Sequence, residues 1–159
     1  MKNSIRRSIR YPGAREHGAA AIELALVLPI LIVFLSFPFF YARCFWHYTV
    51  AQKAAQDAAR YLSMVPAAEM RSPDLALTAA NLAIEIARRE LAELAPGTTI
   101  RTPVATCDAL PCGTVAGAVP EKVRVFINFG MVDNIFGLID TGRYGLPITA
   151  DVTLRYAGT

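Results

Sequence analysis

Glu23, Cys107 and Cys112 are the residues whose types and positions could carry chemistry in this chain of 159 residues. Glu23 is a lone carboxylate near the start of a long apolar run, where a charged side chain is costly in a membrane and by default suggests a function. Cys107 and Cys112 are close enough along the sequence to bond to each other or to share a metal ion. What these residues can do depends on the side of the membrane on which each lies.

The apolar run that follows Glu23 is long enough to cross a membrane. Residues 24–40 carry no charge, and with their flanks they supply the roughly 20 residues that a spanning helix needs. The run is too long for the apolar core of a secretory signal peptide, which has about 7 to 15 residues, so we expect it to be retained. We predict a transmembrane helix over residues 19–42, with Pro29 and Pro38 inside it.

The distribution of charge predicts the orientation of this helix. The formal net charge is +3, and the basic residues ahead of Gly18 are Lys2, Arg6, Arg7, Arg10 and Arg15. By the positive-inside rule, the basic leader of residues 1–18 is cytoplasmic and the chain after residue 42 is exported to the periplasm. We therefore predict a single-pass inner-membrane protein. Its exported part is nearly neutral, which argues against nucleic acid as a partner.

The exported cysteines favour a disulfide. Cys107 and Cys112 lie in a turn-rich stretch outside the cytoplasm, where thiols oxidise, so a bridge that orders this loop is the favoured interpretation. A metal pair would need about two further ligands, and the histidines are His17, before the span, and His47, at its outer edge. Free thiols are the third alternative. Cys44 is either a buried thiol on a helix or one half of an intermolecular bridge.

The sequence gives no local sign of a catalytic site. An enzyme needs a nucleophile with a base, or paired carboxylates in a pocket, and no spacing in the chain suggests either arrangement. The motifs G-x-S-x-G, H-E-x-x-H and the P-loop are absent. We therefore predict a protein that is not an enzyme and that uses no cofactor and no metal.

The exported part has the pattern of an α+β domain. Residues 43–65 continue the first helix, with a stripe of mostly small residues at steps of three and four; the stripe is Tyr41, Cys44, Tyr48, Ala51, Ala55, Ala58, Leu62 and Val65. It could pack against a helix of another subunit or against the chain's own domain, residues 66–159.

A second amphipathic helix and a small sheet are expected within residues 66–159. Ser72, Pro73 and Asp74 are typical of a helix start, and the predicted buried side is Leu75, Ala79, Leu82, Ile86, Leu91 and Leu94. Residues 98–105, 122–129 and 148–155 have extended character, and the last two ranges alternate cleanly. Three antiparallel strands covered by the two helices would give a layer of helix on sheet.

The N-terminal pattern resembles a type IV prepilin cleavage signal, a basic leader that ends in glycine, followed by glutamate at the fifth position and an apolar helix. Residues 18–29 read GAAAIELALVLP, and together with Ala51-Gln52 and Ala58-Ala59-Arg60 they are similar to the TadE-like proteins of tight-adherence (Flp) pilus systems. The similarity covers residues 18–60, with a weaker likeness at 149–156. Leu24 stands where this family usually has an aromatic residue.

This resemblance implies a non-catalytic minor pseudopilin. A prepilin peptidase would cut between Gly18 and Ala19 at the cytoplasmic face, and the protein would join other pilins and pseudopilins and the inner-membrane assembly platform of a pilus used for surface adhesion and biofilm formation. Glu23 could then meet the new amine of Ala19 on another subunit, an attraction of roughly 4 kcal/mol at about 4 Å and an effective dielectric near 20.

Two other interpretations remain at this point. The chain could be an unprocessed, membrane-anchored periplasmic domain that binds a ligand or another envelope protein, with Glu23 a carboxylate that snorkels to the edge of an overlong span. A small membrane-bound enzyme is a third interpretation, which a deep polar pocket with perturbed titratable groups would favour.

Overall fold

The computed structural model of the chain describes residues 16–94, 98–133 and 137–158. Contacts within it divide the chain into two compact units, Met1–Pro38 and Phe39–Thr159. The described part of the first unit is helical and belongs to α1 (Glu16–Ser63), which continues into the second unit. Most of the predicted leader, including all five of its basic residues, lies outside the described residues.

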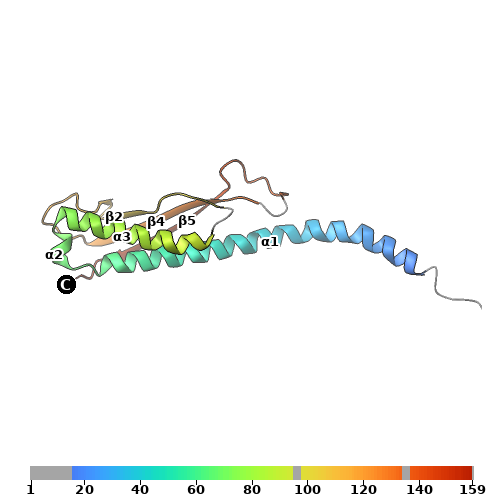
Figure 1. The fold of residues 1–159 in the computed structure, drawn as a ribbon, viewed down its shortest axis with the longest axis horizontal. Coiled ribbons are helices and arrows are strands. Elements are labelled where there is room, and N and C mark those ends of the chain that lie inside the picture. The colour runs from blue at the N-terminus through green and yellow to red at the C-terminus, as the bar shows by residue number, and fades with distance from the viewer. Residues whose placement is uncertain (1–15, 95–97, 134–136, 159) are drawn as a thin grey trace, which may run out of the picture. The chain divides into compact units, whose positions relative to one another are not determined.

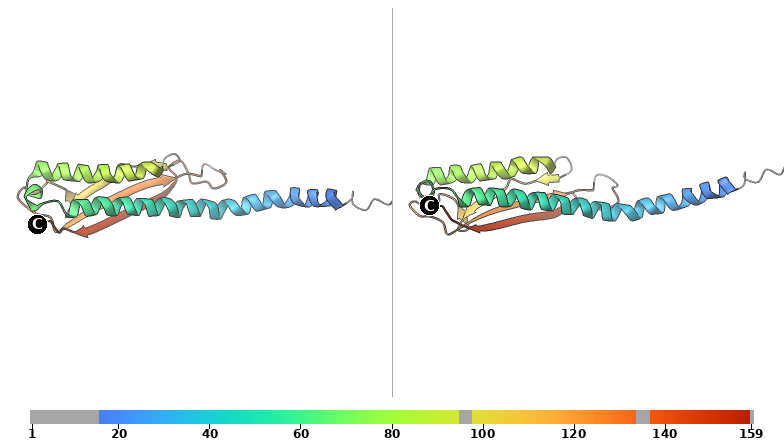
Figure 2. Two further views of the ribbon diagram at one scale, coloured as in Figure 1. Left: turned by 60° about the horizontal axis from the view of Figure 1, so that its bottom comes forward. Right: turned by 90° about the horizontal axis from the view of Figure 1, so that it is seen from below.

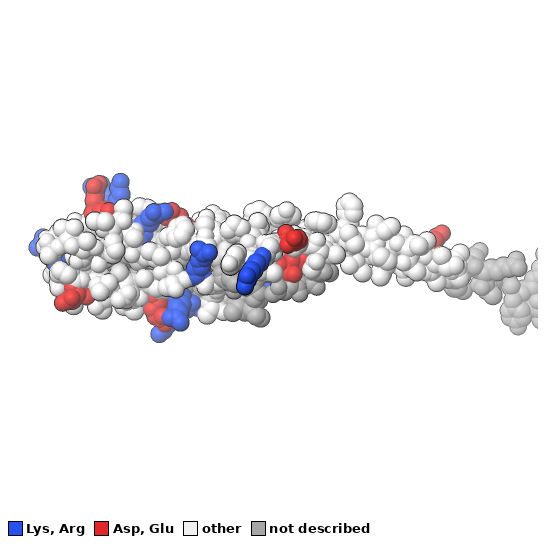
Figure 3. Space-filling view, turned by 90° about the horizontal axis from the view of Figure 1, so that it is seen from above, with Lys and Arg blue, Asp and Glu red and all other residues white. Residues whose placement is uncertain are grey.

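The helix in the first unit is apolar on all sides. Its large side chains are exposed, from Ile32 at 44% to Phe34 at 78%, and Ser36 is a buried exception whose hydroxyl donates to the Val33 carbonyl. Pro29 and Pro38 lie inside α1 without ending it. The same helix is nearly free of coloured charges in Figure 3. A helix that exposes apolar side chains all round must be covered by lipid or by other helices.

The second unit is an α+β fold, as the sequence predicts. After α1 come α2 (Ala67–Met70), α3 (Pro73–Leu91) and a short 3₁₀ turn (Ala92–Leu94). The strands are β1 (Thr98–Ile100), β2 (Val104–Cys107), β3 (Leu110–Pro111), β4 (Lys122–Met131) and β5 (Leu146–Arg155). Figures 1 and 2 show α3 beside the second half of α1, with β2, β4 and β5 forming a layer against the two helices.

The sheet has more strands than the sequence predicts. β4 is central and antiparallel to all its neighbours, pairing with β5 along its full length and with both β1 and β2 along its other edge. The single strand predicted over residues 98–105 is therefore wrong. Strand pairing stops at residues 101–103, between β1 and β2, where Pro103 has no N–H to donate. The Arg101 N–H still donates to the Asn128 carbonyl at 3.1 Å.

The alternation predicted for the two long strands is confirmed. Val123, Val125, Ile127 and Phe129 are fully buried, and Ala150 on β5 is buried beside them. The outer face carries the polar partners, including an ion pair between Arg124 and Asp151 with a nitrogen–oxygen distance of 2.8 Å. The hydrogen bonds from Arg124 hold the pKa of Asp151 below its ordinary value.

The helices pack through alanine. Residues of α1 that are fully buried include Ala51, Ala54, Ala55, Ala58, Ala59 and Leu62. On α3 the buried residues are Ala76, Ala79, Ala80, Ala83, Ala87 and Leu91. The predicted buried side of α3 is therefore wrong at Leu75 and Leu82, each of which is 48% exposed. Small side chains let the helices approach closely, so the leucines occupy the outer face.

The predicted stripe on α1 is correct only in its second half. Tyr41 and Tyr48 are 55% and 40% exposed. The other six residues of the stripe are buried in the chain's own domain: Cys44, Ala51, Ala55, Ala58, Leu62 and Val65. For its six buried residues the structure shows the second alternative, packing against the chain's own domain. The alanines pack against the chain's own domain, while the tyrosines face outward.

The C-terminal end is tied to the end of α1. The Tyr156 hydroxyl donates to the Val65 carbonyl, and the Ala157 N–H donates to the Ser63 carbonyl at 2.9 Å. A Cβ added at Gly158 would lie 2.1 Å from the Val65 carbonyl oxygen, so no larger residue fits without movement. β5 is therefore fastened to α1 just past its last strand residue.

Candidate functional site

No contact among the described residues requires glycine at position 18. A Cβ added at Gly18 would meet nothing within 4 Å, and its φ lies outside the left-handed region. Glycine inside a helix costs about 0.5–1 kcal/mol relative to alanine, so an unconstrained glycine is unfavourable for folding alone. Gly18, Ala19 and Ala20 are all exposed. The packing of the described residues would therefore accept a larger side chain at position 18.

Glu23 lies one turn further along the same exposed helix. Its neighbours Ile22 and Leu24 are 64% and 61% exposed, so the carboxylate is surrounded by uncovered apolar surface. Among the residues whose side chains the structure describes, none forms a hydrogen bond or ion pair with Glu23. A membrane or a neighbouring helix that covered this surface would also remove water from the carboxylate, which would then need a partner.

His47 and the free thiol of Cys44 are both buried. His47 is 2% exposed, its Nδ1 lies 2.8 Å from the Arg43 carbonyl, and its ring packs against Phe129 with 6.5 Å between centroids. Cys44 is a free thiol and 8% exposed. Of the two alternatives for Cys44, the structure shows the buried thiol. Within the described residues there is no group of three His, Cys, Asp or Glu side chains that could hold a metal ion.

An aromatic cluster on α1 was missed by sequence reasoning. Phe45 is 70% exposed and Trp46 is 57% exposed, and both lie close to the exposed Tyr41 and Tyr48. The signal that could have revealed it is the density of Phe, Tyr and Trp directly after the uncharged run, because such residues favour the boundary between lipid and water. The heptad pattern drew attention to the tyrosines as core residues instead.

The described parts of the chain contain one helix long and apolar enough to cross a membrane, and it begins at Gly18. This is consistent with a single-pass anchor. Residues 18–60 match the model of the family described as TadE-like protein. The chain carries a TadE-like segment. No curated protein and no solved structure matches the chain.

The TadE-like segment coincides with most of α1. It begins at Gly18 and takes in Glu23, the exposed apolar helix, the aromatic cluster and the first buried alanines, and it ends three residues before Ser63. It covers the same residues as the resemblance found in the sequence. α3, the sheet and the disulfide loop lie beyond it, so the structure alone describes them.

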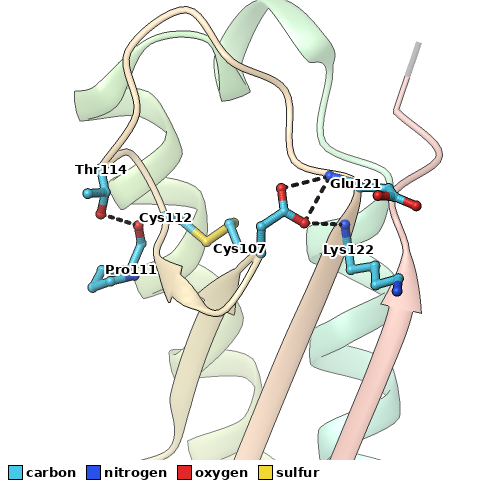
Figure 4. The surroundings of a disulfide bond; sticks show 7 residues. Cys107, Pro111, Cys112, Thr114, Glu121 and Lys122 are labelled. Atoms are coloured by element: carbon cyan, nitrogen blue, oxygen red, sulfur yellow. Dashed lines mark hydrogen bonds between the residues drawn. A yellow bond between two sulfur atoms is a disulfide. The ribbon is translucent and has the colours of Figure 1, made fainter.

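The loop that follows β2 is closed by a disulfide between Cys107 and Cys112 (Figure 4). Asp108 has a φ of 49°, and its carboxylate accepts hydrogen bonds from the backbone N–H groups of Glu121, at 2.9 Å, and Lys122, at 2.8 Å. Gly113 has a φ of +84°, and an added Cβ would lie 2.4 Å from the Pro73 carbonyl oxygen. The loop is thus held against β4 on one side and the start of α3 on the other.

We expect removal of this disulfide to lower stability without unfolding the domain. A double Cys107→Ser, Cys112→Ser variant should lose about 2 kcal/mol of unfolding free energy, because so short a loop gains little from closure. Denaturant unfolding of the full chain in detergent micelles, followed by circular dichroism, measures this loss. Reductant added to the wild type should reproduce it and should leave the double variant unchanged. An unfolded variant would contradict the expectation, since it would mean that the bridge holds the fold together.

Glu90 on α3 is the titratable group most affected by the packing of the two helices. Burial raises its pKa, and the nearby Asp57 carboxylate on α1 adds to the effect. Lys53 partly offsets it. Glu90, Asp57 and Lys53 lie where α1 and α3 meet, and they interact with one another across the two helices.

Proposed function

We propose that this TadE-like protein is a non-catalytic minor pseudopilin, processed after Gly18 by a prepilin peptidase, that takes part in assembly of a tight-adherence pilus. The observation that carries the proposal is the start of the family match at Gly18, an exposed glycine that the chain's own packing does not require. A protease that binds the chain in an extended conformation supplies the missing reason, since a bulky side chain at the cut would obstruct its cleft.

The helix after Gly18 has properties that support a role for cleavage in preparing the protein to assemble with other subunits. The cut creates an amine at Ala19, four residues before the exposed Glu23. Small residues at positions 19–21 would allow this amine to approach the Glu23 carboxylate of a neighbouring subunit. The exposed apolar side chains of α1 would then be covered by lipid before assembly and by other helices after it.

The proposed location and partners follow from the same features. The protein would span the inner membrane once, with its N-terminus cytoplasmic and its α+β domain periplasmic, and could enter an extracellular pilus. Its partners would be the prepilin peptidase, other pilins and pseudopilins, the assembly platform and membrane lipid. The pilus would serve surface adhesion and biofilm formation.

The decisive experiment is to determine the intact mass and N-terminal sequence of the protein from its native membrane, with and without the cognate prepilin peptidase. A peptidase-dependent chain that begins at Ala19 is the expected result. A chain that keeps residues 1–18 in both strains would overturn the proposal and would favour an unprocessed, membrane-anchored domain that interacts with other envelope proteins. A Gly18→Val variant, which should remain uncut in the presence of the peptidase, serves as the matched control.

A further inference from the structure

The second unit exposes an uncharged patch at the end of the domain where α1 enters it. Its members are the helix residues Tyr41, Phe45, Trp46 and Tyr48 together with Leu138, which lies between β4 and β5, and Leu146, the first residue of β5; each is at least 40% exposed. We call this set the juxtamembrane patch. Its residues come from positions about 100 apart in the sequence, so the fold and not the helix alone creates it.

Contacts hold the two halves of the patch side by side. Tyr41, Phe45 and Tyr48 line one shallow hollow together with Leu146, and the surface of that hollow is entirely apolar. One residue beyond Leu138, Ile139 packs on the small cluster that Phe40 and Cys44 of α1 form with Met131. The carboxylate of Asp133 accepts the backbone N–H groups of Leu138 and Ile139, at 3.1 and 3.2 Å, and so fixes this part of the segment.

The position of the patch along α1 corresponds to the boundary between lipid and water. Residues 24–42 contain no Asp, Glu, Lys or Arg, and at 1.5 Å per residue this run is about 28 Å long as helix. That length matches the hydrocarbon core of a bilayer, about 30 Å, and the polar layer on each side adds about 6 Å. If Glu23 and Arg43 bracket the core, the next turn of helix, with Phe45 and Trp46, falls in the polar layer.

The chemistry of the patch fits the same layer. Trp and Tyr are enriched where one end of the ring meets acyl chains and the other meets water. If the patch faced water, its apolar surface would stay hydrated, which is less favourable than burial by about 25 cal/mol per Å².

We propose that the juxtamembrane patch is a lipid-binding surface, so that Leu138 and Leu146 lie in the headgroup layer of the bilayer at the same depth as Phe45 and Trp46. The ligand is phospholipid, whose acyl chains contact the aromatic rings and the leucine side chains of the patch. Lipid binding by this patch is separate from pilus assembly, since it concerns the protein in the membrane before assembly. It is expected whether or not the leader is cut.

Tryptophan quenching by lipid tests the proposal on the full chain. Trp46 is the chain's one tryptophan, so a Leu138→Trp variant in a Trp46→Phe background reports on the β4–β5 segment alone. Each protein is reconstituted at low protein-to-lipid ratio in phosphatidylcholine and phosphatidylglycerol vesicles whose acyl chains carry bromine near the headgroup. Val115→Trp in the same background is the control, because Val115 is 57% exposed and lies between Cys112 and Gly117, whose N–H donates to the Arg71 carbonyl just before α3.

We expect Trp46 in the wild type and the tryptophan at position 138 both to lose most of their emission in brominated vesicles, with blue-shifted spectra, while the tryptophan at position 115 keeps its emission. Emission at position 138 that matches the control would overturn the proposal, since the segment would then lie in water. Protection of position 138 from aqueous iodide without quenching by bromine would also overturn it, because a second protein chain would then cover the patch. Since uncut protein can be used throughout, the outcome is independent of the processing experiment.

Discussion

A Glu23→Gln variant is expected to be cut after Gly18 as efficiently as the wild type and to lose incorporation into the pilus assembly. Glutamine keeps the size of the side chain and removes its charge, so the attraction to the Ala19 amine of a neighbouring subunit disappears. That attraction is roughly 4 kcal/mol at about 4 Å and an effective dielectric near 20. Even half of it corresponds to a change of about 30-fold in an equilibrium constant.

Cross-linking in native membranes, followed by recovery of the other subunits of the system, measures this effect. Glu69→Gln is a suitable control, because Glu69 is an exposed glutamate on α2 in the second unit and lies outside the TadE-like segment. Equal recovery of partners with Glu23→Gln and with the wild type would show that the charge has no role in assembly. Glu23 would then be a carboxylate that simply reaches the edge of the membrane.

The second large effect is expected from enlarging a buried alanine on α3. Ala83 is fully buried in the core that α1, α3 and the sheet share. Ala83→Leu adds three carbon atoms where the helices already touch through small side chains, so we expect a loss of about 1–3 kcal/mol of unfolding free energy. Urea unfolding of the full chain in detergent micelles, followed by helical circular dichroism, gives the value.

The neighbouring residue provides the opposite substitution. Leu82 is 48% exposed on the outer face of α3, so Leu82→Ala should change the unfolding free energy by less than about 0.5 kcal/mol. If Leu82→Ala proves more damaging than Ala83→Leu, the leucine side of α3 is the packed one and the helix is rotated relative to the structure described above.

These two residues also show how far sequence patterns can predict this fold. The long elements α1, α3, β4 and β5 were predictable, because helix starts such as Ser72-Pro73 and strict alternation in β4 and β5 depend on neighbouring residues. Which face of α3 is buried was not, since hydrophobicity ranks leucine above alanine. The alanine face of α3 is the buried one because it lets α3 lie close to α1. That contact cannot be read from the sequence of α3, since α1 is remote in sequence.

The candidate site shows the same division. Gly18 and Glu23 could be singled out from local spacing alone, and the family match begins at the first of them. The juxtamembrane patch could not be found in that way, because Leu138 and Leu146 reach α1 only through the pairing of β4 with β5. Strands β1 and β2 were merged into one for a related reason. Their separation at Pro103 appears only when both are placed along the same edge of β4.

The attachment of β5 to α1 at both ends has a mechanical consequence. Ile148 near the start of the strand shares a hollow with Cys44, and Tyr156 just past its end holds the Val65 carbonyl, so helix and strand run side by side in the same direction. A pull along the axis of α1 would therefore load these attachments in shear, and they would have to break together. Contacts arranged to peel apart one after another would yield at a much lower force.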